Sequence, residues 1–545
     1  MKIALCQINS IVGDLEGNAK LILEYYAKAK AAGADLAVFP ELALTGYPPL
    51  DLIERKDFVL KALHILTTKI VPNITGCGAV LGSINRNYNA GKPYYNSAFF
   101  IDDKLIVSVI NKQLLPTYDL FDERRYYQEG NYSSPVYYKG LRLGIHICED
   151  MWRNESEYSQ KLYPIDPVDN LGEQGVDIFV NLSASPFARA KDLKRQRIMK
   201  KSSLKWNVPF LMVNTVGAND SVVFDGRSKY ISSKGEVLVE GKAFEEDFVI
   251  VDTDKEIQTP VVKDSDIETV HKALVLGLRD YVKKNGLSGV VVGISGGIDS
   301  AVCAVLAKEA VGAKNVTCVT MPTRFSSEGS IKDSEKLCKN IGVEFVKIPI
   351  EDMFQKMTDD IRSNSNLTLK DVTMENIQPR LRGTILMAFS NTMNGRIVIA
   401  PGNKSEIATG YCTLYGDTCG ALGLIGDIYK TEVFELADFI NRDTEVIPME
   451  IRNKKPSAEL RHDQYDTDTL PPYDALDTVL KLYIEDNLSP EEIYTKVSMN
   501  KNTVDMIIEM ILRSEFKRKQ LPPVIKISTK SFILDRRWPV VHKFK

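Results

Sequence analysis

A glycine-rich turn, Ser295-Gly296-Gly297-Ile298-Asp299-Ser300, follows the apolar run Val290–Ile294 and precedes the helical pattern Ala301–Ala310. Its glycines let consecutive backbone N–H groups converge on an anion, and the helix N-terminus adds partial positive charge. The serines can add hydroxyl donors, and Asp299 can hold Mg²⁺ against a phosphate. The turn is neither a Walker A loop nor a G-x-G-x-x-G loop, because it lacks the trailing Gly-Lys and the wider spacing. A plain tight turn is the alternative, but this residue set after a buried strand favours phosphate binding.

Three further motifs, each just after a predicted strand, carry a glutamate, a lysine and a cysteine. They are Phe39-Pro40-Glu41-Leu42, Asn111-Lys112-Gln113-Leu114 and His146-Ile147-Cys148-Glu149-Asp150. A thiol is mostly protonated at neutral pH, so a nearby lysine can favour the thiolate and a glutamate can move the proton. Lys112 and a backbone N–H beside Cys148 could also stabilise an oxyanion. Taken singly, each residue has a structural alternative: Cys148 as a buried apolar side chain, Glu41 as a helix cap.

Short apolar runs alternate with helical patterns over the first 250 residues, which predicts a layered α/β sandwich that positions these motifs. The predicted strands are Ile3–Ile8, Leu36–Phe39, Ala79–Ile84, Ala98–Ile101, Leu105–Asn111, Leu141–Ile147, Ile178–Leu182, Phe210–Asn214 and Phe248–Val251. The predicted helices are Asn18–Ala32, Phe58–Ile70 and Leu193–Trp206.

A polar stretch that ends at Pro260 separates two differently patterned halves. We therefore expect a first domain over residues 1–254, a linker over 255–267 and a second domain over 268–545. In the second domain, helices alternate with buried strands, which is typical of a doubly wound parallel sheet. The expected elements are helix Ile267–Asn285, strand Gly289–Ile294, helix Ala301–Ala310, strand Val316–Thr320, helix Lys332–Ile341 and strand Val343–Pro349, with a mostly helical stretch from Pro471 to Lys519.

The bulk composition is that of a globular protein too long for one core, with 545 residues, 44% hydrophobic and 26% charged. A net charge of -3 gives no sign of a nucleic-acid-binding surface, and no apolar run is long enough for a membrane span. The N-terminus lacks the pattern of a signal peptide. Eight scattered cysteines without a C-x-x-C pair predict free thiols in a reducing cytoplasm.

The Glu, Lys and Cys motifs together resemble the nitrilase superfamily over roughly residues 1–255. The resemblance implies an α-β-β-α sandwich with Glu41 as general base, Lys112 as electrostatic support and Cys148 as nucleophile. It further implies a γ-glutamyl thioester and free ammonia, with Glu123 orienting Lys112. By the same resemblance L-glutamine would be held by Tyr118, Ser185 and Lys191, although Ser183 and Arg189 offer the same spacing. Tyr47, Glu149 and Trp152 would line the same pocket.

The glycine turn resembles the pyrophosphate loop of the N-type ATP pyrophosphatases, which include NAD, GMP and asparagine synthetases. The segments Glu375–Arg382, Pro401–Glu406, Thr413–Asp417 and Leu424–Thr431 are similar to NAD synthetases. The resemblance implies a Rossmann-like sheet of the adenine nucleotide alpha hydrolase type. The implied ATP contacts are Gly293, Ile294, Ser295, Gly296, Gly297, Ile298, Asp299, Ser300 and Pro401. The implied deamido-NAD contacts are Asn376, Glu406, Asp417 and Lys517.

Within this resemblance, Asp299 and Glu406 are the expected Mg²⁺ ligands, and Lys430 and Lys404 are candidate phosphate-binding cations. One departure is Pro401, where NAD synthetases usually carry threonine, so a side-chain contact to ATP is lost there.

The two halves together predict a ligase that adenylates deamido-NAD⁺ with ATP and amidates it with ammonia from glutamine. Another adenylating amidotransferase, of the GMP synthetase type, is the alternative, but that class carries a Cys-His-Glu glutaminase and no matching histidine is visible. A binding or regulatory protein with an inert glutaminase half is disfavoured because all three triad positions are filled. We also expect an enclosed passage for ammonia between the domains and assembly into a homo-oligomer.

Overall fold

The computed structural model describes residues 1–154, 162–255, 264–532 and 535–544. The chain divides into two compact units, Met1–Asp264 and Ser265–Lys545. Residues 256–263 of the expected linker lie outside the described residues, and the first helix of the second unit, α6, begins at Asp266. Among the described helices none is long and apolar enough to cross a membrane.

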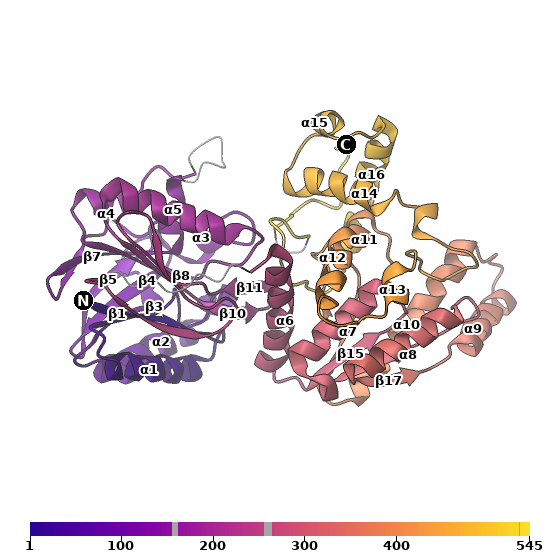
Figure 1. The fold of residues 1–545 in the computed structure, drawn as a ribbon, viewed down its shortest axis with the longest axis horizontal. Coiled ribbons are helices and arrows are strands. Elements are labelled where there is room, and N and C mark those ends of the chain that lie inside the picture. Colours follow the sequence, from indigo (N-terminus) through magenta and orange to yellow (C-terminus); the bar gives the residue numbers. More distant parts are fainter. Residues whose placement is uncertain (155–161, 256–263, 533–534, 545) are drawn as a thin grey trace. The chain divides into compact units, whose positions relative to one another are not determined.

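The first unit contains two six-stranded sheets, ordered β14-β1-β2-β3-β4-β5 and β13-β12-β9-β8-β7-β6. In Figure 1, α1 and α2 lie on one side of these strands and α4 and α5 on the other. The strands are β1 Lys2–Gln7, β2 Leu36–Val38, β3 Gly78–Arg86, β4 Tyr94–Asp102, β5 Leu105–Asn111, β6 Val136–Tyr138, β7 Leu141–Ile147, β8 Ile178–Ser183, β9 Phe210–Asn214, β10 Val216–Asn219, β11 Val222–Asp225, β12 Lys229–Ile231, β13 Val237–Glu240 and β14 Asp247–Asp252. The helices are α1 Leu15–Ala31, α2 Lys56–Ile65, α3 Glu123–Tyr126, α4 Pro167–Glu173 and α5 Lys191–Trp206.

Alternation along buried strands explains the layers, since successive side chains of a strand point to opposite faces. In β1, Ile3 and Leu5 join the core between the two sheets, whereas Ala4 and Cys6 pack with α1 and α2. In β8, Val180 faces the same central core while its neighbours pack toward α4 and α5. The predicted α-β-β-α sandwich is therefore confirmed.

All nine predicted strands and three predicted helices of this unit are present, with ends shifted by a few residues. The prediction did not include β6 and β10 to β13, which have only three or four residues each. Such short runs give too little periodicity to be recognised in a sequence.

The second unit contains a five-stranded parallel sheet in the order β17-β16-β15-β18-β19. From β15 the chain adds strands first on one side (β16, β17) and then on the other (β18, β19), so the strand order changes direction between β15 and β18. A doubly wound sheet binds its ligands at this change of direction, at the carboxyl ends of the strands. The glycine-rich turn follows β15 there. The strands are β15 Gly289–Gly293, β16 Val316–Thr320, β17 Glu344–Lys347, β18 Arg396–Ala400 and β19 Leu422–Gly423.

Helices pack around this sheet and continue beyond it in a C-terminal helical group. The helices are α6 Asp266–Lys284, α7 Ile298–Val311, α8 Glu328–Ile341, α9 Glu351–Asn364, α10 Asp371–Thr392, α11 Lys404–Thr409, α12 Lys430–Ile440, α13 Met449–Asn453, α14 Tyr473–Leu480, α15 Pro490–Lys496, α16 Lys501–Arg513 and α17 Glu515–Arg518. Among them, α14, α15 and α16 form their own apolar core with α11. The predicted order of elements and the helical stretch after Pro471 are confirmed.

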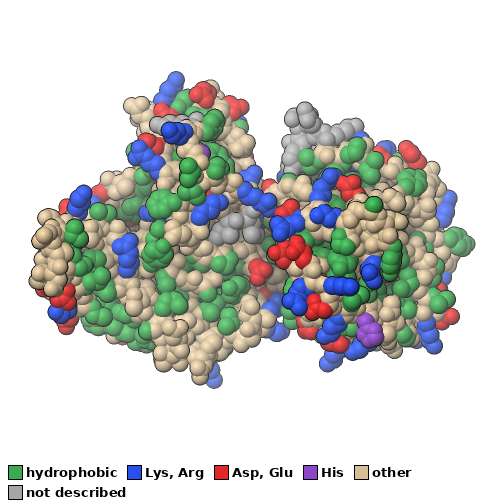
Figure 2. Space-filling view, turned by 180° about the vertical axis from the view of Figure 1, so that it is seen from behind, with side chains coloured by type: hydrophobic (Ala, Val, Ile, Leu, Met, Phe, Trp, Pro, Cys, Tyr) green, Lys and Arg blue, Asp and Glu red, His purple; other side chains and the backbone are tan. Residues whose placement is uncertain are grey.

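Basic side chains are scattered among acidic and apolar ones over the described atoms of the face shown in Figure 2.

Candidate functional sites

Glu41, Lys112 and Cys148 follow β2, β5 and β7, and all three side chains are buried. Lys112 Nζ donates to Glu41 Oε1 at 2.7 Å and to Glu123 Oε1 at 2.8 Å. The other Glu41 oxygen, Oε2, accepts from the backbone N–H of Ala184 at 2.9 Å. A lysine between two carboxylates is thus fixed in place in a site shielded from water.

The charges of this site act directly on the Cys148 thiol. Burial and the carboxylate of Glu41 raise the pKa of Cys148 well above its ordinary value, although Lys112 acts to lower it. Burial alone would lower the pKa of Lys112, but Glu123 and Glu41 hold it well above its ordinary value. Cys148 therefore rests as a thiol beside a permanent cation, and a base has to take its proton during attack. Its backbone φ of 42° lies in the left-handed region, a strained conformation that clusters at functional sites.

Asp150 ties the lysine-bearing loop to the cysteine-bearing loop. Its Oδ1 accepts from the backbone N–H groups of Gln113 and Leu114 at 2.9 and 2.8 Å. Its Oδ2 accepts from the N–H of Ile147 at 3.0 Å. One buried carboxylate therefore sets the spacing of Lys112 and Cys148, a role that the sequence did not reveal.

Among the residues expected to form the glutamine pocket, Tyr118 contacts Glu149 and Lys191 contacts Trp152. The hydroxyl of Tyr118 donates to Glu149 at 2.8 Å, and so does that of Tyr163, a residue that the sequence analysis missed. Lys191 lies over the ring of Trp152, 5.6 Å from its centroid. Tyr47 donates to Glu123 at 2.8 Å, and the backbone of Ser185 donates to Asn214 at 2.8 Å. The expected glutamine-binding roles of all these residues stay predictions.

Burial raises the pKa of Glu149 to about 7, although the two tyrosine hydroxyls and Lys112 act to lower it. The folded state therefore holds a proton on Glu149 that the unfolded chain releases near pH 4.5. The contribution of Glu149 to the free energy of unfolding is thus fully present at low pH and is lost as pH rises through about 7. We expect Glu149→Gln to raise the free energy of unfolding of the first unit by about 3 kcal/mol more at pH 8 than at pH 5. Urea titrations at both values measure this, with Glu173→Gln at the exposed end of α4 as control. An equal effect of Glu149→Gln at both values would contradict it.

The glycine-rich turn of the second unit is held open by its own serines. Ser300 Oγ accepts from the N–H of Ser295 at 3.3 Å, and Ser295 Oγ accepts from the N–H of Gly297 at 3.2 Å. Gly296 has a φ of 78°, and a Cβ at this position would lie 2.5 Å from the carbonyl of Ser330. A side chain at this position would clash with Ser330 at the start of α8, so the turn requires glycine here.

A carboxylate pair lies beside this turn. Asp299, in the first turn of α7, accepts from Asn403 Nδ2 at 2.9 Å and pairs with Lys430, which also lies 3.7 Å from Glu406. Burial and Asp299 raise the pKa of Glu406 to about 8. One lysine therefore does not compensate both carboxylates fully, and a divalent cation suits this donor set.

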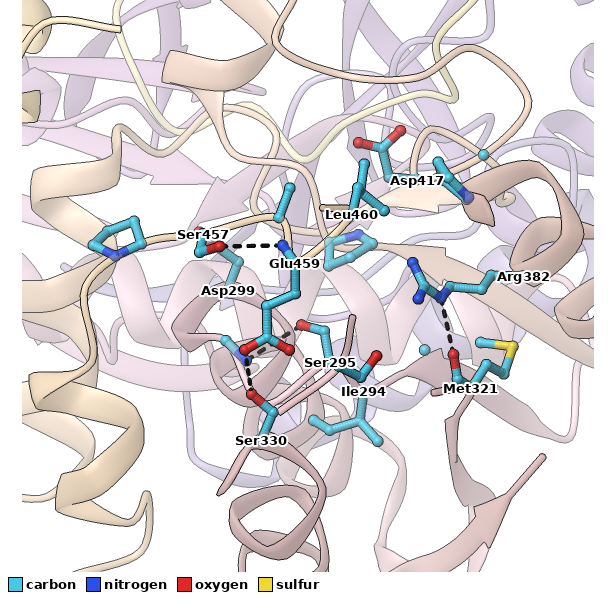
Figure 3. Close-up of a pocket in the computed structure, with 18 of the residues that line it drawn as sticks. Ile294, Ser295, Asp299, Met321, Ser330, Arg382, Asp417, Ser457, Glu459 and Leu460 are labelled. Carbon is cyan, nitrogen blue, oxygen red and sulfur yellow. Dashed lines mark hydrogen bonds between the residues drawn. The ribbon is translucent and has the colours of Figure 1, made fainter. Parts of the chain in front are cut away.

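A large pocket opens at the carboxyl ends of β15, β16 and β18, and Figure 3 shows part of its lining. Of the residues expected to contact nucleotide, Gly296 and Ser300 of the turn do not line it. Those that line it are Gly293, Ile294, Ser295, Gly297, Ile298, Asp299, Pro401, Glu406 and Asp417. Asn376 and Lys517 lie behind its wall: Asn376 accepts from Thr413 at 2.6 Å, and Lys517 donates to the carbonyls of Gly410 and Cys412. The sequence analysis did not single out two further parts of the lining, Arg382 and residues 454–460, whose loop sequence carries no recognisable chemistry of its own.

Lys404 is not a phosphate-binding cation, so that prediction was wrong. Its fully buried Nζ contacts Asp427 at 3.1 Å, Glu485 at 3.0 Å and Ser528 at 2.7 Å, away from the pocket. These partners come from distant parts of the chain, so a sequence motif could not reveal them.

Because Lys404 neutralises the buried Asp427 and the partly buried Glu485, Lys404→Met is expected to lower the free energy of unfolding by about 3–5 kcal/mol. Urea unfolding of the second unit measures the loss. Lys356→Met, whose partner Asp360 lies on an exposed helix face, is the control and should leave the unfolding midpoint unchanged. An unchanged midpoint for Lys404→Met would show that the buried network does not stabilise the fold.

Comparison with known proteins gives a class for each unit. Residues 2–259 match the carbon-nitrogen hydrolase family and residues 270–521 match the NAD synthase family. Two domains of these classes in one chain define an enzyme that couples amide hydrolysis to amide synthesis.

Full-length relatives specify the class further. The chain is 39% identical over 558 residues to a glutamine-dependent NAD(+) synthetase of Synechocystis sp. and 40% identical over 586 residues to that of Thermotoga maritima, covering at least 99% of each protein. It is also similar to a structure of glutamine-dependent NAD⁺ synthetase from Acinetobacter baumannii in complex with ADP, with 33% identity, a TM-score of 0.78, and 99% of this chain and 98% of that one covered. The chain belongs to the family of glutamine-dependent NAD⁺ synthetases.

Proposed function

We propose that the first unit releases ammonia from glutamine and that the second unit uses it to amidate adenylated deamido-NAD⁺, giving NAD⁺, AMP, pyrophosphate and glutamate. The observation that carries the proposal is that one chain positions both a buried Glu41–Lys112–Cys148 set and a phosphate-binding turn at the switch point of a doubly wound sheet. The first would supply the nitrogen that the second consumes.

In the first unit, Glu41 takes the proton of the Cys148 thiol as the sulfur attacks the amide carbon of glutamine. Lys112 and the backbone beside Cys148 stabilise the negative oxygen of the tetrahedral intermediate. Glu41 then returns the proton to the nitrogen, ammonia leaves, and a γ-glutamyl thioester remains. A water molecule, deprotonated by Glu41, attacks the thioester, and glutamate leaves as the thiol is restored.

In the second unit, the carboxylate of deamido-NAD⁺ attacks the α-phosphorus of ATP and expels pyrophosphate. The backbone N–H of Gly296 and those at the start of α7 offer donors to the departing phosphates, because the N–H groups of Ser295 and Gly297 already donate to serine hydroxyls of the turn. Ammonia then attacks the acyl carbon, AMP leaves, and the nitrogen loses a proton. Pro401 provides no side-chain donor to the nucleotide, so the turn carries more of the phosphate binding here.

The residues present fit a Mg²⁺ ion. Asp299 and Glu406 would hold it, because the two carboxylates share one lysine, Lys430, and a cation could replace the proton that the raised pKa of Glu406 favours. Bound there, the ion would neutralise charge that develops on the phosphates of ATP.

Analysis of the products formed from glutamine, ATP, Mg²⁺ and deamido-NAD⁺ tests the proposal. We expect NAD⁺ and AMP in equal amounts, and formation of ADP instead would contradict it. Amidation of xanthylate but not of deamido-NAD⁺ would support the GMP synthetase alternative. With ¹⁵N-glutamine and excess unlabelled ammonium, retention of the label in NAD⁺ would support direct transfer of ammonia between the units.

Two further expectations belong to this proposal. The eight cysteines are free thiols, which supports a reducing, cytoplasmic compartment. Assembly into a homo-oligomer also stays a prediction, which light scattering tests.

A further inference from the structure

Arg382 is a cation on the pocket wall that forms no ion pair with a carboxylate among the described residues. Its Nε donates to the carbonyl oxygen of Met321 at 3.0 Å. Among the described residues, Nη1 and Nη2 have no hydrogen-bond partner, and no carboxylate oxygen lies within 4.0 Å of the guanidinium. By contrast, Lys430 pairs with Asp299, and Lys454 pairs with Glu459.

The register of α10 directs this side chain into the pocket. Pro379, Arg382, Gly383 and Leu386 all line it, and the spacing i, i+3, i+4, i+7 places them on one helix face. Figure 3 shows the guanidinium extending into the space between Asp417 and Met321. One turn further on, Leu386 packs against Gly293, where a Cβ would lie 3.1 Å from its Cδ1.

These contacts place Arg382 at the carboxyl ends of two neighbouring strands. Met321 directly follows β16, and Gly293 is the last residue of β15, just before the glycine-rich turn. The hydrogen bond from Nε fixes the plane of the guanidinium and leaves its two terminal nitrogens available as parallel donors. Burial lowers the pKa of Arg382 to about 10, although Glu459 and Asp417 act to raise it. The guanidinium has therefore lost part of its hydration, and an anion bound to it would offset this cost of burying the charge.

We propose that Arg382 binds phosphate oxygens of a nucleotide substrate in this pocket, an assignment that rests on the proposed function. Two parallel N–H donors match the spacing of phosphate oxygens, and a charge-assisted hydrogen bond in a partly desolvated pocket is among the stronger polar contacts. The phosphate belongs either to ATP or to the pyrophosphate bridge of the dinucleotide, and binding of each ligand separately distinguishes the two.

The test is calorimetric binding of three ligands to the full chain: α,β-methylene-ATP, deamido-NAD⁺ and adenosine. Arg382→Gln should weaken the binding of at least one of the two phosphate-bearing ligands by about 10-fold or more. The affinity for adenosine should not change. Arg382→Lys keeps the charge but not the paired donors, so its affinity for these ligands should lie between that of the native chain and that of Arg382→Gln. The difference in affinity for the phosphate-bearing ligands between the native chain and Arg382→Gln should become smaller as the salt concentration rises.

Arg362→Gln, a charge change on the exposed face of α9, is the matched control and should not alter binding. Unchanged affinity of Arg382→Gln for both phosphate-bearing ligands overturns the proposal, as does an equal loss for adenosine, which would indicate contact with the base or the fold. If Arg382→Gln does not fold, Arg382→Met is measured against the same ligands. Failure of the native chain to form NAD⁺ would instead count against the proposed function, because these binding measurements do not need turnover.

Discussion

Replacement of Cys148 by alanine is expected to abolish NAD⁺ synthesis from glutamine while leaving synthesis from ammonium salts close to the native rate. In the proposed mechanism the sulfur attacks the amide, so its loss should cost at least about 10³-fold in glutamine-dependent kcat. Alanine is smaller than cysteine at this buried position, and the ion pair of Glu41 and Lys112 stays in place. The second unit, which folds around its own core, should therefore keep its activity.

Two outcomes separate this interpretation from a structural role of the cysteine. Cys148→Ser keeps the hydrogen-bonding capacity and much of the size of the thiol, and it should be as inactive with glutamine as the alanine variant. A native chain given glutamine should accumulate a thioester that hydroxylamine traps, and the alanine variant should not. Equal activity of Cys148→Ala with glutamine and with ammonium would contradict the assignment of Cys148 as nucleophile.

Asp299→Asn, unlike Cys148→Ala, is expected to lose NAD⁺ synthesis with both nitrogen donors, glutamine and ammonium. The substitution keeps the shape of the side chain and a hydrogen-bond acceptor for Asn403 but removes the charge next to Lys430 and the phosphate-binding turn. A charged group that acts where charge develops on the phosphates contributes about 10²–10³-fold to kcat. Initial rates with ammonium as the nitrogen donor and pyrophosphate as the measured product give this loss directly.

The control for this variant is the exposed aspartate Asp360 on α9, where Asp360→Asn should change neither rate. Raising the Mg²⁺ concentration should partly restore Asp299→Asn if the lost function is cation binding. Native rates for Asp299→Asn with both nitrogen donors would exclude Asp299 from the chemistry of the second unit. A simultaneous loss of the thioester in the first unit would instead indicate that the two activities are coupled.

Sequence reasoning located the chemistry wherever it depends on short runs after strands. Glu41, Lys112 and Cys148 each follow a buried strand that its apolar residues made visible, and the glycine-rich turn needs only its own six residues to form its hydrogen bonds. Local patterns also predicted the sandwich and the doubly wound sheet, because strand alternation and helical periodicity are properties of contiguous residues.

Other features depend on residues that meet only in the folded chain. Lys404 lies within a segment similar to NAD synthetases, yet Asp427, Glu485 and Ser528 hold it in a buried network. Arg382 was part of a recognised segment, but its role followed from the helix register and the position of Met321. The spacing of residues in the sequence predicts neither the buried contacts of Lys404 nor the position of Met321 beside Arg382.

By itself, therefore, the sequence predicted which side chains would do chemistry and determined on which kind of element each is placed, because strand ends, glycine turns and apolar periodicity are local. Only the tertiary structure decided the electrostatic state of those side chains. Glu123 sits at 2.8 Å from Lys112, Glu406 shares Lys430 with Asp299, and Asp150 joins two loops. Burial and the charges brought in from distant segments set each pKa, and those depend on the packed core rather than on the order of residues along the chain.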